Sequence, residues 1–213
     1  MAVERAKRMA ILYSDAKREY FPTEEQYITE AEVEGRAKVV TPFFEKIGIK
    51  VDLIPANEAL LDVLKSFRPD FVLNLVDSVR GQESLAATVP AVLELLNIPY
   101  TGTGVLGAAL NSNKFLTKKL MEQAGLPLPR YQLFSSPNDP IDTHLKFPLI
   151  SKLNEVHGSV AISQDSVSEN EAHLRARLKS LMGTYRGQPI LAEEFIVGRE
   201  LTSFVLEGAM RKV

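Results

Sequence analysis

The chain has 213 residues, of which 45% are hydrophobic and 24% are charged, with a formal net charge of -2 and no cysteine. These fractions are typical of a folded globular protein and exclude a disordered or fibrous chain, and the small net charge offers no positive field for nucleic acid or an anionic membrane. The lack of cysteine excludes disulfide bonds and thiolate metal sites, and no apolar run approaches the roughly 20 residues of a spanning helix, so we expect a cytoplasmic protein.

The first half of the chain alternates between short apolar runs and amphipathic segments. Strands are expected at residues 9–13, 51–54 and 71–76, and helices at residues 29–47, 58–67 and 84–96. The first of these helices shows the three- and four-residue spacing of apolar residues, as in Val33, Ala37 and Phe44. Alternation of strand and helix predicts an α/β fold with a doubly wound parallel sheet.

A glycine-rich turn follows, in which Gly102, Gly104 and Gly107 form a G-x-G-x-x-G pattern with Glu122 at roughly the spacing of a ribose-binding acid. This pattern favours a dinucleotide-dependent oxidoreductase when it follows the first strand of a sheet. Here it follows what would be the fourth strand, and Glu122 lies within a helix expected at residues 114–124. A structural turn is therefore the alternative interpretation.

The second half has shorter segments, beginning after Pro127 and Pro129. Strands are expected at residues 131–134, 147–153, 159–163, 190–194 and 201–206, and a helix at residues 168–181. This mixture predicts an α+β unit with antiparallel strands. We divide the chain into residues 1–110, 111–189 and 190–213, and expect a fragment, because a last strand at residues 210–213 would leave its backbone groups unpaired.

Two lysines are candidates for binding phosphate. Lys114 begins a helix behind Asn113, where free backbone N–H groups and the helix dipole favour an anion. Lys152 ends an apolar run, and the loop after it contains Gly158 and Ser159, which could fold over phosphates and donate backbone N–H groups. Solvated surface lysines and an ordinary loop are the alternative.

A third candidate is the acidic run that contains Glu193, Glu194, Phe195 and Ile196 and leads through a glycine turn to Glu200. A strand edge offers alternating backbone donors and acceptors to an adenine ring, and an acid after the turn could accept hydrogen bonds from both ribose hydroxyls. The alternative is an exposed hairpin whose acids keep it soluble.

Residues 98–104, then Asn113-Lys114 and the helix that leads to Pro127, resemble the central stretch of D-alanine–D-alanine ligases of the ATP-grasp superfamily. The second lysine, the glycine loop and the acidic run then follow in the order of that family. The resemblance implies an N-terminal pre-ATP-grasp domain at 1–110, a central ATP-grasp subdomain at 111–189, and the start of a C-terminal subdomain at 190–213 whose remainder is absent. It also implies a ligase that joins a carboxylate to an amine through an acylphosphate, with ATP and magnesium.

The resemblance also implies roles for individual residues. Lys114 and Lys152 resemble the lysines that contact ATP phosphates, Gly158 and Ser159 the lid loop, Glu193, Glu194, Phe195 and Ile196 the adenine hinge, Glu200 the ribose acid, and Glu83 the carboxylate that orients the substrate or its binding loop. The metal ligands of the family are expected beyond Val213, so no metal ligand is assigned within the chain. The expected partners are small carboxylate and amine substrates, with amino acids as candidates, and a second copy of the chain in a homodimer.

Several positions depart from the family's pattern. Asn113 stands where aspartate is usual, Leu153 replaces a proline, Ala161 replaces a glycine of the lid, and the first strand lacks the family's glycine- and serine-containing pattern. The substrates therefore stay open, and a non-catalytic, regulatory ATP-binding module is the alternative to a ligase. We expect the chain alone to bind nucleotide weakly and to catalyse nothing.

Overall fold

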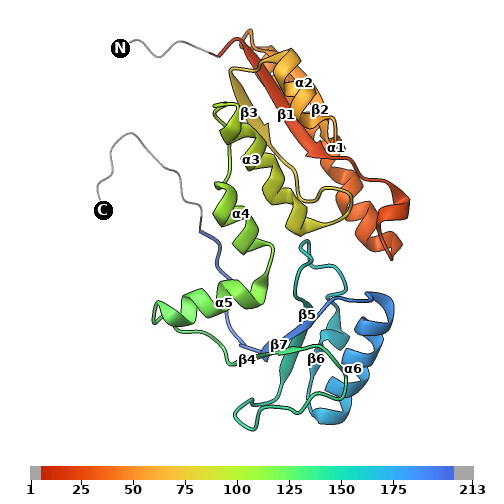
Figure 1. Ribbon diagram of the computed structural model, residues 1–213. Coiled ribbons are helices and arrows are strands. Elements are labelled where there is room, and N and C mark those ends of the chain that lie inside the picture. The colour runs from red at the N-terminus through yellow and green to blue at the C-terminus, as the bar shows by residue number, and fades with distance from the viewer. Residues whose placement is uncertain (1–5, 204–213) are drawn as a thin grey trace.

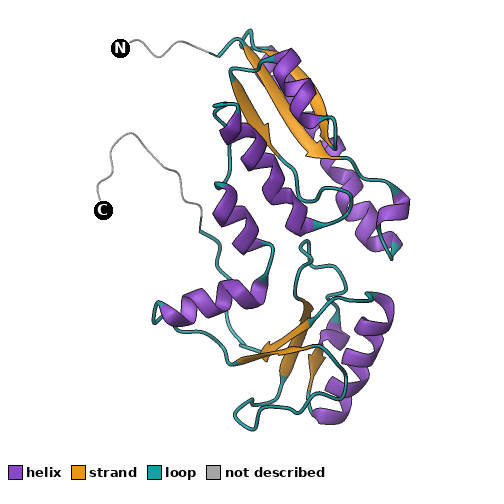
Figure 2. Ribbon diagram, in the orientation of Figure 1, coloured by secondary structure: helices purple, strands orange, loops and turns teal. Residues whose placement is uncertain are grey.

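The computed structural model describes residues 6–203, and these residues build two units that each contain one β-sheet (Figures 1 and 2). Helices α4 (Val105–Asn111) and α5 (Lys114–Gln123) connect the two units along one side of the molecule (Figure 1). No helix within the described residues is both long enough and apolar enough to cross a membrane.

The first unit is built on a three-stranded parallel sheet in the order β2-β1-β3. Its strands are β1 (Arg8–Ser14), β2 (Lys50–Ala56) and β3 (Phe71–Asn74). Side chains of a strand alternate between faces, so Met9 and Ile11 pack with α1 (Glu24–Glu45) on one face. Ala10 and Leu12 pack on the other face with α2 (Leu60–Phe67) and α3 (Thr88–Leu95). Helices on both faces confirm the predicted doubly wound parallel sheet.

The helices of this unit do not begin at the residues predicted from the sequence, and for α1 a capping side chain explains the difference. Helix α1 begins at Glu24 instead of residue 29, since the hydroxyl of Thr23 accepts a hydrogen bond from the Gln26 N–H at 3.3 Å and caps the helix. The helix expected at residues 84–96 is a 3-10 turn (Glu83–Ala87) followed by α3. A further 3-10 turn, Arg18–Tyr20, precedes α1.

The glycine-rich turn carries the chain from the edge of this sheet into α4. Tyr100 forms an isolated bridge with Val72 of β3, and Gly102 has a φ of +105°, a backbone conformation that favours glycine. Glu122 lies on α5, where it accepts hydrogen bonds from Lys119 at 2.9 Å and Tyr131 at 3.0 Å. These positions agree with the structural interpretation of the turn and place Glu122 away from it.

The second unit is a four-stranded antiparallel sheet in the order β4-β7-β5-β6, covered on one face by α6 (Glu171–Thr184). Its strands are β4 (Tyr131–Phe134), β5 (Leu149–Leu153), β6 (Val167–Ser168) and β7 (Ile190–Glu194). Leu174 and Leu178 of α6 are fully buried against Leu149, Leu153 and Ile190 of the sheet. The predicted α+β unit is confirmed.

The strand expected at residues 159–163 is wrong. Ser159 and Ala161 have φ values of 58° and 59°, in the left-handed region instead of the β region, and the segment is a turn that leads into a 3-10 turn at Gln164–Ser166. Residues 201–203 are not in a strand, and the rest of the strand expected at 201–206, like the one at 210–213, lies outside the described residues. The domain boundaries at 110 and 189 stay predictions.

Candidate functional site

Lys114 and Lys152 line the same pocket, although they come from different segments of the chain. Lys114 is the first residue of α5, and Lys152 lies near the end of β5, in the second sheet. The pocket has a volume of about 290 Å³. Its other lining residues are Asn111, Thr117, Lys118, Met121, Leu191 and Glu193. The two candidate lysines therefore converge on one space, which is the geometry that a shared anionic ligand requires.

Lys114 is held with its ammonium group partly removed from water. Its Nζ donates a hydrogen bond to the Val156 carbonyl oxygen at 2.6 Å. Burial lowers the pKa of this ammonium group, and the nearby Lys152 charge lowers it further, while Glu83 and Glu193 act in the opposite direction. A partly desolvated cation beside a second cation gains from binding an anion.

The backbone at the start of α5 is already satisfied by the protein. The N–H of Lys114 donates to the Asn154 carbonyl oxygen at 3.1 Å, that of Phe115 to Asn154 Oδ1 at 2.9 Å, and that of Leu116 to Asn113 Oδ1 at 3.0 Å. The expectation that free N–H groups of this helix bind an anion is therefore wrong. The side-chain cation of Lys114 is what the helix offers to a ligand.

Glu193 sits between two lysines. Lys152 Nζ lies 2.6 Å from its Oε1 and Lys118 Nζ lies 2.5 Å from its Oε2, and the residue is only 7% exposed. Burial alone would raise the pKa of this carboxyl group, but the interactions with Lys118 and Lys152 hold it below its ordinary value. Glu193 therefore stays ionised in the pocket.

Lys118 was not singled out from the sequence. The available signal is its spacing, because residues four apart on a helix lie on the same face, so Lys118 follows Lys114 by one turn toward the same pocket. Many surface helices contain lysines at this spacing. Only the position of Glu193 on the neighbouring strand distinguishes this pair.

The rest of the expected adenine hinge continues from β7 beyond the residues that line the pocket. Glu194 is the next residue of the strand, so its side chain lies on the face of the sheet opposite to that of Glu193. Its Oε1 accepts a hydrogen bond from the Lys146 N–H at 3.1 Å. The Phe195 N–H donates to the Pro148 carbonyl oxygen at 2.9 Å, and the side chain of Ile196 is largely exposed. Glu200 is also exposed, and does not line the pocket.

The loop that contains Gly158 and Ser159 bends toward the first unit (Figure 1). Gly158 has a φ of +67°, and a Cβ atom added there would lie 2.8 Å from Thr29 Cγ2 on α1. The Ala161 N–H donates to Glu25 Oε1 at 3.3 Å. The loop is thus docked on α1 rather than extended into solvent.

Glu83 fixes the same loop through His157. One oxygen of its carboxylate accepts a hydrogen bond from the backbone N–H of His157, and the other lies in ion-pair contact with His157 Nδ1. Interaction of the imidazole with the Glu83 carboxylate raises the pKa of His157 by more than burial lowers it. Glu83 thus contacts the loop at His157, and its role toward a substrate stays a prediction.

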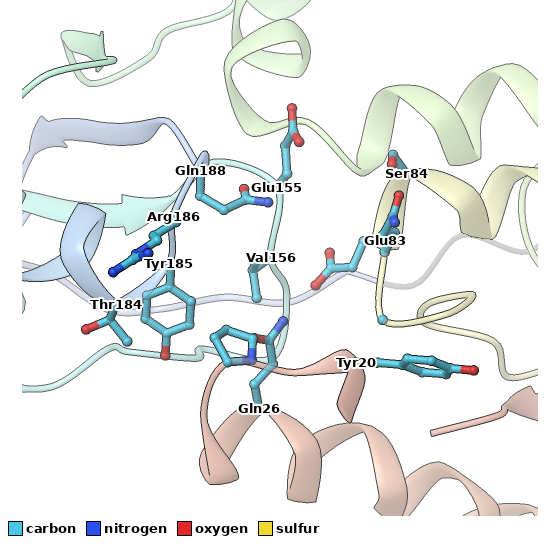
Figure 3. Close-up of a pocket in the computed structure, with 13 residues that line it drawn as sticks. Tyr20, Gln26, Glu83, Ser84, Glu155, Val156, Thr184, Tyr185, Arg186 and Gln188 are labelled. Atoms are coloured by element: carbon cyan, nitrogen blue, oxygen red, sulfur yellow. The ribbon is translucent and has the colours of Figure 1, made fainter. Parts of the chain in front are cut away.

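Figure 3 shows a second cavity, of about 430 Å³, between the two units. Tyr20 and Gln26 line it from the first unit and Tyr185 and Gln188 from the second, and Figure 3 shows Val156 between Tyr185 and Glu83. It shares no lining residue with the lysine pocket. The two spaces are therefore separate.

A third cavity, of about 320 Å³, lies where the parallel sheet ends. Asn74 at the end of β3, Asp77 and Glu83 line it together with His157, and Asn111 belongs both to this cavity and to the lysine pocket. Burial raises the pKa of the Asp77 carboxyl group. Open parallel sheets commonly bind ligands at the carboxyl ends of their strands, so this cavity is a candidate substrate site next to the lysines.

The chain is similar to known ligases in sequence and in fold. It is 34% identical over 176 residues to D-alanine–D-alanine ligase from Desulforudis audaxviator, covering 81% of this chain and 55% of that protein. It is 32% identical over 162 residues to D-alanine–D-alanine ligase from Azorhizobium caulinodans, covering 76% and 51%. No family model matches the chain. The chain spans about half the length of the curated relatives that it matches.

Solved structures agree on the fold. The crystal structure of D-alanine–D-alanine ligase from Bacillus anthracis complexed with ATP superposes with a TM-score of 0.63 at 21% identity, covering 91% of this chain and 60% of that one. L-amino acid ligase from Bacillus licheniformis superposes with a TM-score of 0.55 at 19% identity, covering 92% and 46%. The chain therefore has the fold of part of an ATP-grasp ligase. Within that class it is D-alanine–D-alanine ligase-like, and the resemblance found in the sequence is confirmed.

Proposed function

We propose that this chain carries the nucleotide-binding part of an ATP-dependent ligase, which joins a carboxylate to an amine through an acylphosphate. The observation that carries the proposal is the convergence of Lys114 and Lys152 on one pocket, in a chain similar to proteins named D-alanine–D-alanine ligase. The proposed substrates are a small carboxylate and a small amine, with amino acids as candidates.

The charges of the pocket suit a polyphosphate. Lys114, Lys118 and Lys152 line it with Glu193 as the acid among its lining residues, so positive charge is in excess. Electrostatic attraction is stronger in a partly buried site than in water, which favours a multiply charged anion. We assign the phosphates to Lys114 and Lys152, the covering loop to Gly158 and Ser159, and the adenine and ribose to the segment from Glu193 through Ile196 and to Glu200.

A bound ATP would supply a γ-phosphoryl group, whose transfer spreads negative charge over several oxygens. The ammonium groups of Lys114 and Lys152 would hold the phosphate oxygens and stabilise that charge. The described residues contain no group of three or more His, Asp or Glu side chains placed to hold a metal ion. That the magnesium ligands lie beyond Val213 stays a prediction.

We place the carboxylate substrate in the cavity at the end of the parallel sheet. It adjoins the lysine pocket at Asn111, so a carboxylate bound there would be near the phosphates. The docked loop at His157 and Gly158 would exclude water, which protects an acylphosphate from hydrolysis. Glu83 would act by holding this loop in place.

A homodimer in the cytoplasm is part of the same proposal. Val39, Phe43 and Ile47 are exposed at four-residue intervals from α1 onward, and an exposed apolar stripe supports self-association. Light scattering at several protein concentrations tests the dimer, and a monomer at every concentration would contradict it.

Nucleotide product analysis tests the ligase. With ATP, magnesium and amino acids, the whole native protein should form ADP and phosphate in equal amounts together with an amide. Formation of AMP, or no ATP binding at all, would contradict the proposal. The alternative regulatory module predicts ATP binding without ADP formation, and the same assay on the 213 residues alone tests whether they are inactive.

A further inference from the structure

We propose that Lys118 is a positioning residue of the nucleotide pocket, which holds the Glu193 carboxylate so that the Lys152 ammonium group stays available to phosphate. This inference rests on the proposed function, because it assigns a role within the same pocket.

The geometry places one carboxylate between two cations. Glu193 Oε2 lies 2.5 Å from Lys118 Nζ, and Glu193 Oε1 lies 2.6 Å from Lys152 Nζ. The Glu193 side chain is 10% exposed and that of Lys118 15%, whereas that of Lys152 is 33% exposed. The Lys118 contact is therefore the more enclosed of the two, and Lys152 is the lysine that still reaches solvent.

The surroundings of Lys118 fix its position. Its Nζ lies 5.3 Å from the centre of the Tyr131 ring, and Tyr131 is the direct partner of Glu193 in the pairing of β4 with β7. A cation over an aromatic ring is attracted to the ring face. Lys118 thus joins α5, which carries Lys114, to the strand that carries Glu193.

Lys118 is proposed to act by sharing the negative charge of Glu193 with Lys152. While Lys118 is present, one oxygen of Glu193 is bound to it, and Lys152 pairs with the other oxygen alone. Without Lys118, a buried carboxylate would be left with a single cation and would hold that cation more strongly. Lys152 would then be drawn toward Glu193 and away from an incoming phosphate, and the pocket would also lose one positive charge.

The variant Lys118→Met tests this inference in the full chain, with binding of ATP, ADP and AMP measured by calorimetry. We expect the ATP dissociation constant to rise about tenfold, the size expected for one lost charge-assisted hydrogen bond. The loss should shrink from ATP to ADP to AMP, because the proposed effect acts on phosphate binding. Lys118→Arg keeps the charge and should recover most of the affinity.

Lys119→Met is the matched control. Lys119 is the next residue on α5 and its variant has the same change in net charge, but its side chain is 51% exposed and pairs with Glu122. ATP affinity should change less than about twofold, because an exposed pair contributes little. If the two variants melt at different temperatures, ATP binding is compared at a temperature below both unfolding transitions, where both variants are folded.

A second readout does not depend on nucleotide. Carboxyl carbon chemical shifts followed against pH should show a higher titration midpoint for Glu193 in Lys118→Met than in the native chain, and no change in Lys119→Met. Native-like ATP affinity in a folded Lys118→Met variant would overturn this inference alone, as would an equal loss for ATP and AMP. Absence of ATP binding by the native chain would overturn the proposed function and this inference with it.

Discussion

His157 and Glu83 join the two units of the molecule through a pair of contacts to one carboxylate. Glu83 comes from the turn before α3, and His157 from the loop after β5. Thr23 and Tyr185 add a further connection, with 3.3 Å between their hydroxyl oxygens. The two units are therefore joined by polar contacts at more than one place, and the contact of Glu83 with His157 involves an imidazole that can titrate.

The loop contact should weaken as pH rises. Hydrogen bonding to Glu83 raises the pKa of His157, with Asp77 also favouring the charged form electrostatically and Lys114 opposing it. A raised pKa in the folded state means that the stabilisation is complete below the unfolded value of about 6.5 and is lost as pH rises through the folded value. The hydrogen-exchange rate of the loop amides should rise with pH more steeply than the intrinsic exchange rate does.

The His157→Gln variant should lose this additional pH dependence. If the variant keeps it, His157 is not the group that titrates.

Removing either candidate phosphate lysine should weaken ATP binding. Lys114→Met and Lys152→Met should each raise the ATP dissociation constant by about tenfold or more, because a charge-assisted contact in a partly buried pocket is lost. The native affinity should also fall with added salt. Lys179→Met, at an exposed position of α6, is the control and should bind as the native chain does. Unchanged affinity in both pocket variants would rule out the pocket as the phosphate site.

A side chain at position 158 should undock the loop. Gly158→Ala adds a Cβ atom 2.8 Å from Thr29 Cγ2 and places alanine at a φ of +67°, so we expect a loss of about 1–2 kcal/mol in the free energy of unfolding. Gly187→Ala is matched, because Gly187 has a φ of +80° but no neighbour within 4 Å of an added Cβ. The difference between the two variants in thermal melts and in loop proteolysis isolates the contact with α1. Equal effects would mean that the contact does not matter.

The contacts of the Asn113 side chain explain why asparagine, and not aspartate, occupies this position. Its Oδ1 caps α5 and its Nδ2 donates to Glu155 Oε1 at 2.9 Å, which an aspartate could not do. Asn113→Asp should therefore place two carboxylates together and cost about 1 kcal/mol in the free energy of unfolding. Adding Glu155→Gln to the Asn113→Asp variant should recover the lost stability, since the glutamine amide can donate a hydrogen bond to the new carboxylate. Denaturant unfolding of the single and double variants measures both effects, and a single variant as stable as the native chain would contradict this explanation.

Local sequence patterns were enough to predict the layers of the fold and the order of the candidate motifs. Apolar runs such as residues 9–13 and 71–73, and the spacing of Val33, Ala37 and Phe44, are local patterns, because they depend on which side of a strand or helix is buried. Local patterns also located α5 and Asn113 as its cap. They failed at residues 159–163, where positive φ values at Ser159 and Ala161 occur in a loop docked on another unit.

Which side chains meet depends on the packing of segments that are far apart in the chain. The Asn154 contacts that occupy the N–H groups of α5, the pairing of Lys118 with Glu193, and the contact of His157 with Glu83 all join segments distant in the sequence. Their distances depend on how two sheets and the helices between them pack, which no local propensity encodes. The same packing brings Lys114 and Lys152 to one pocket and leaves Glu200 outside its lining.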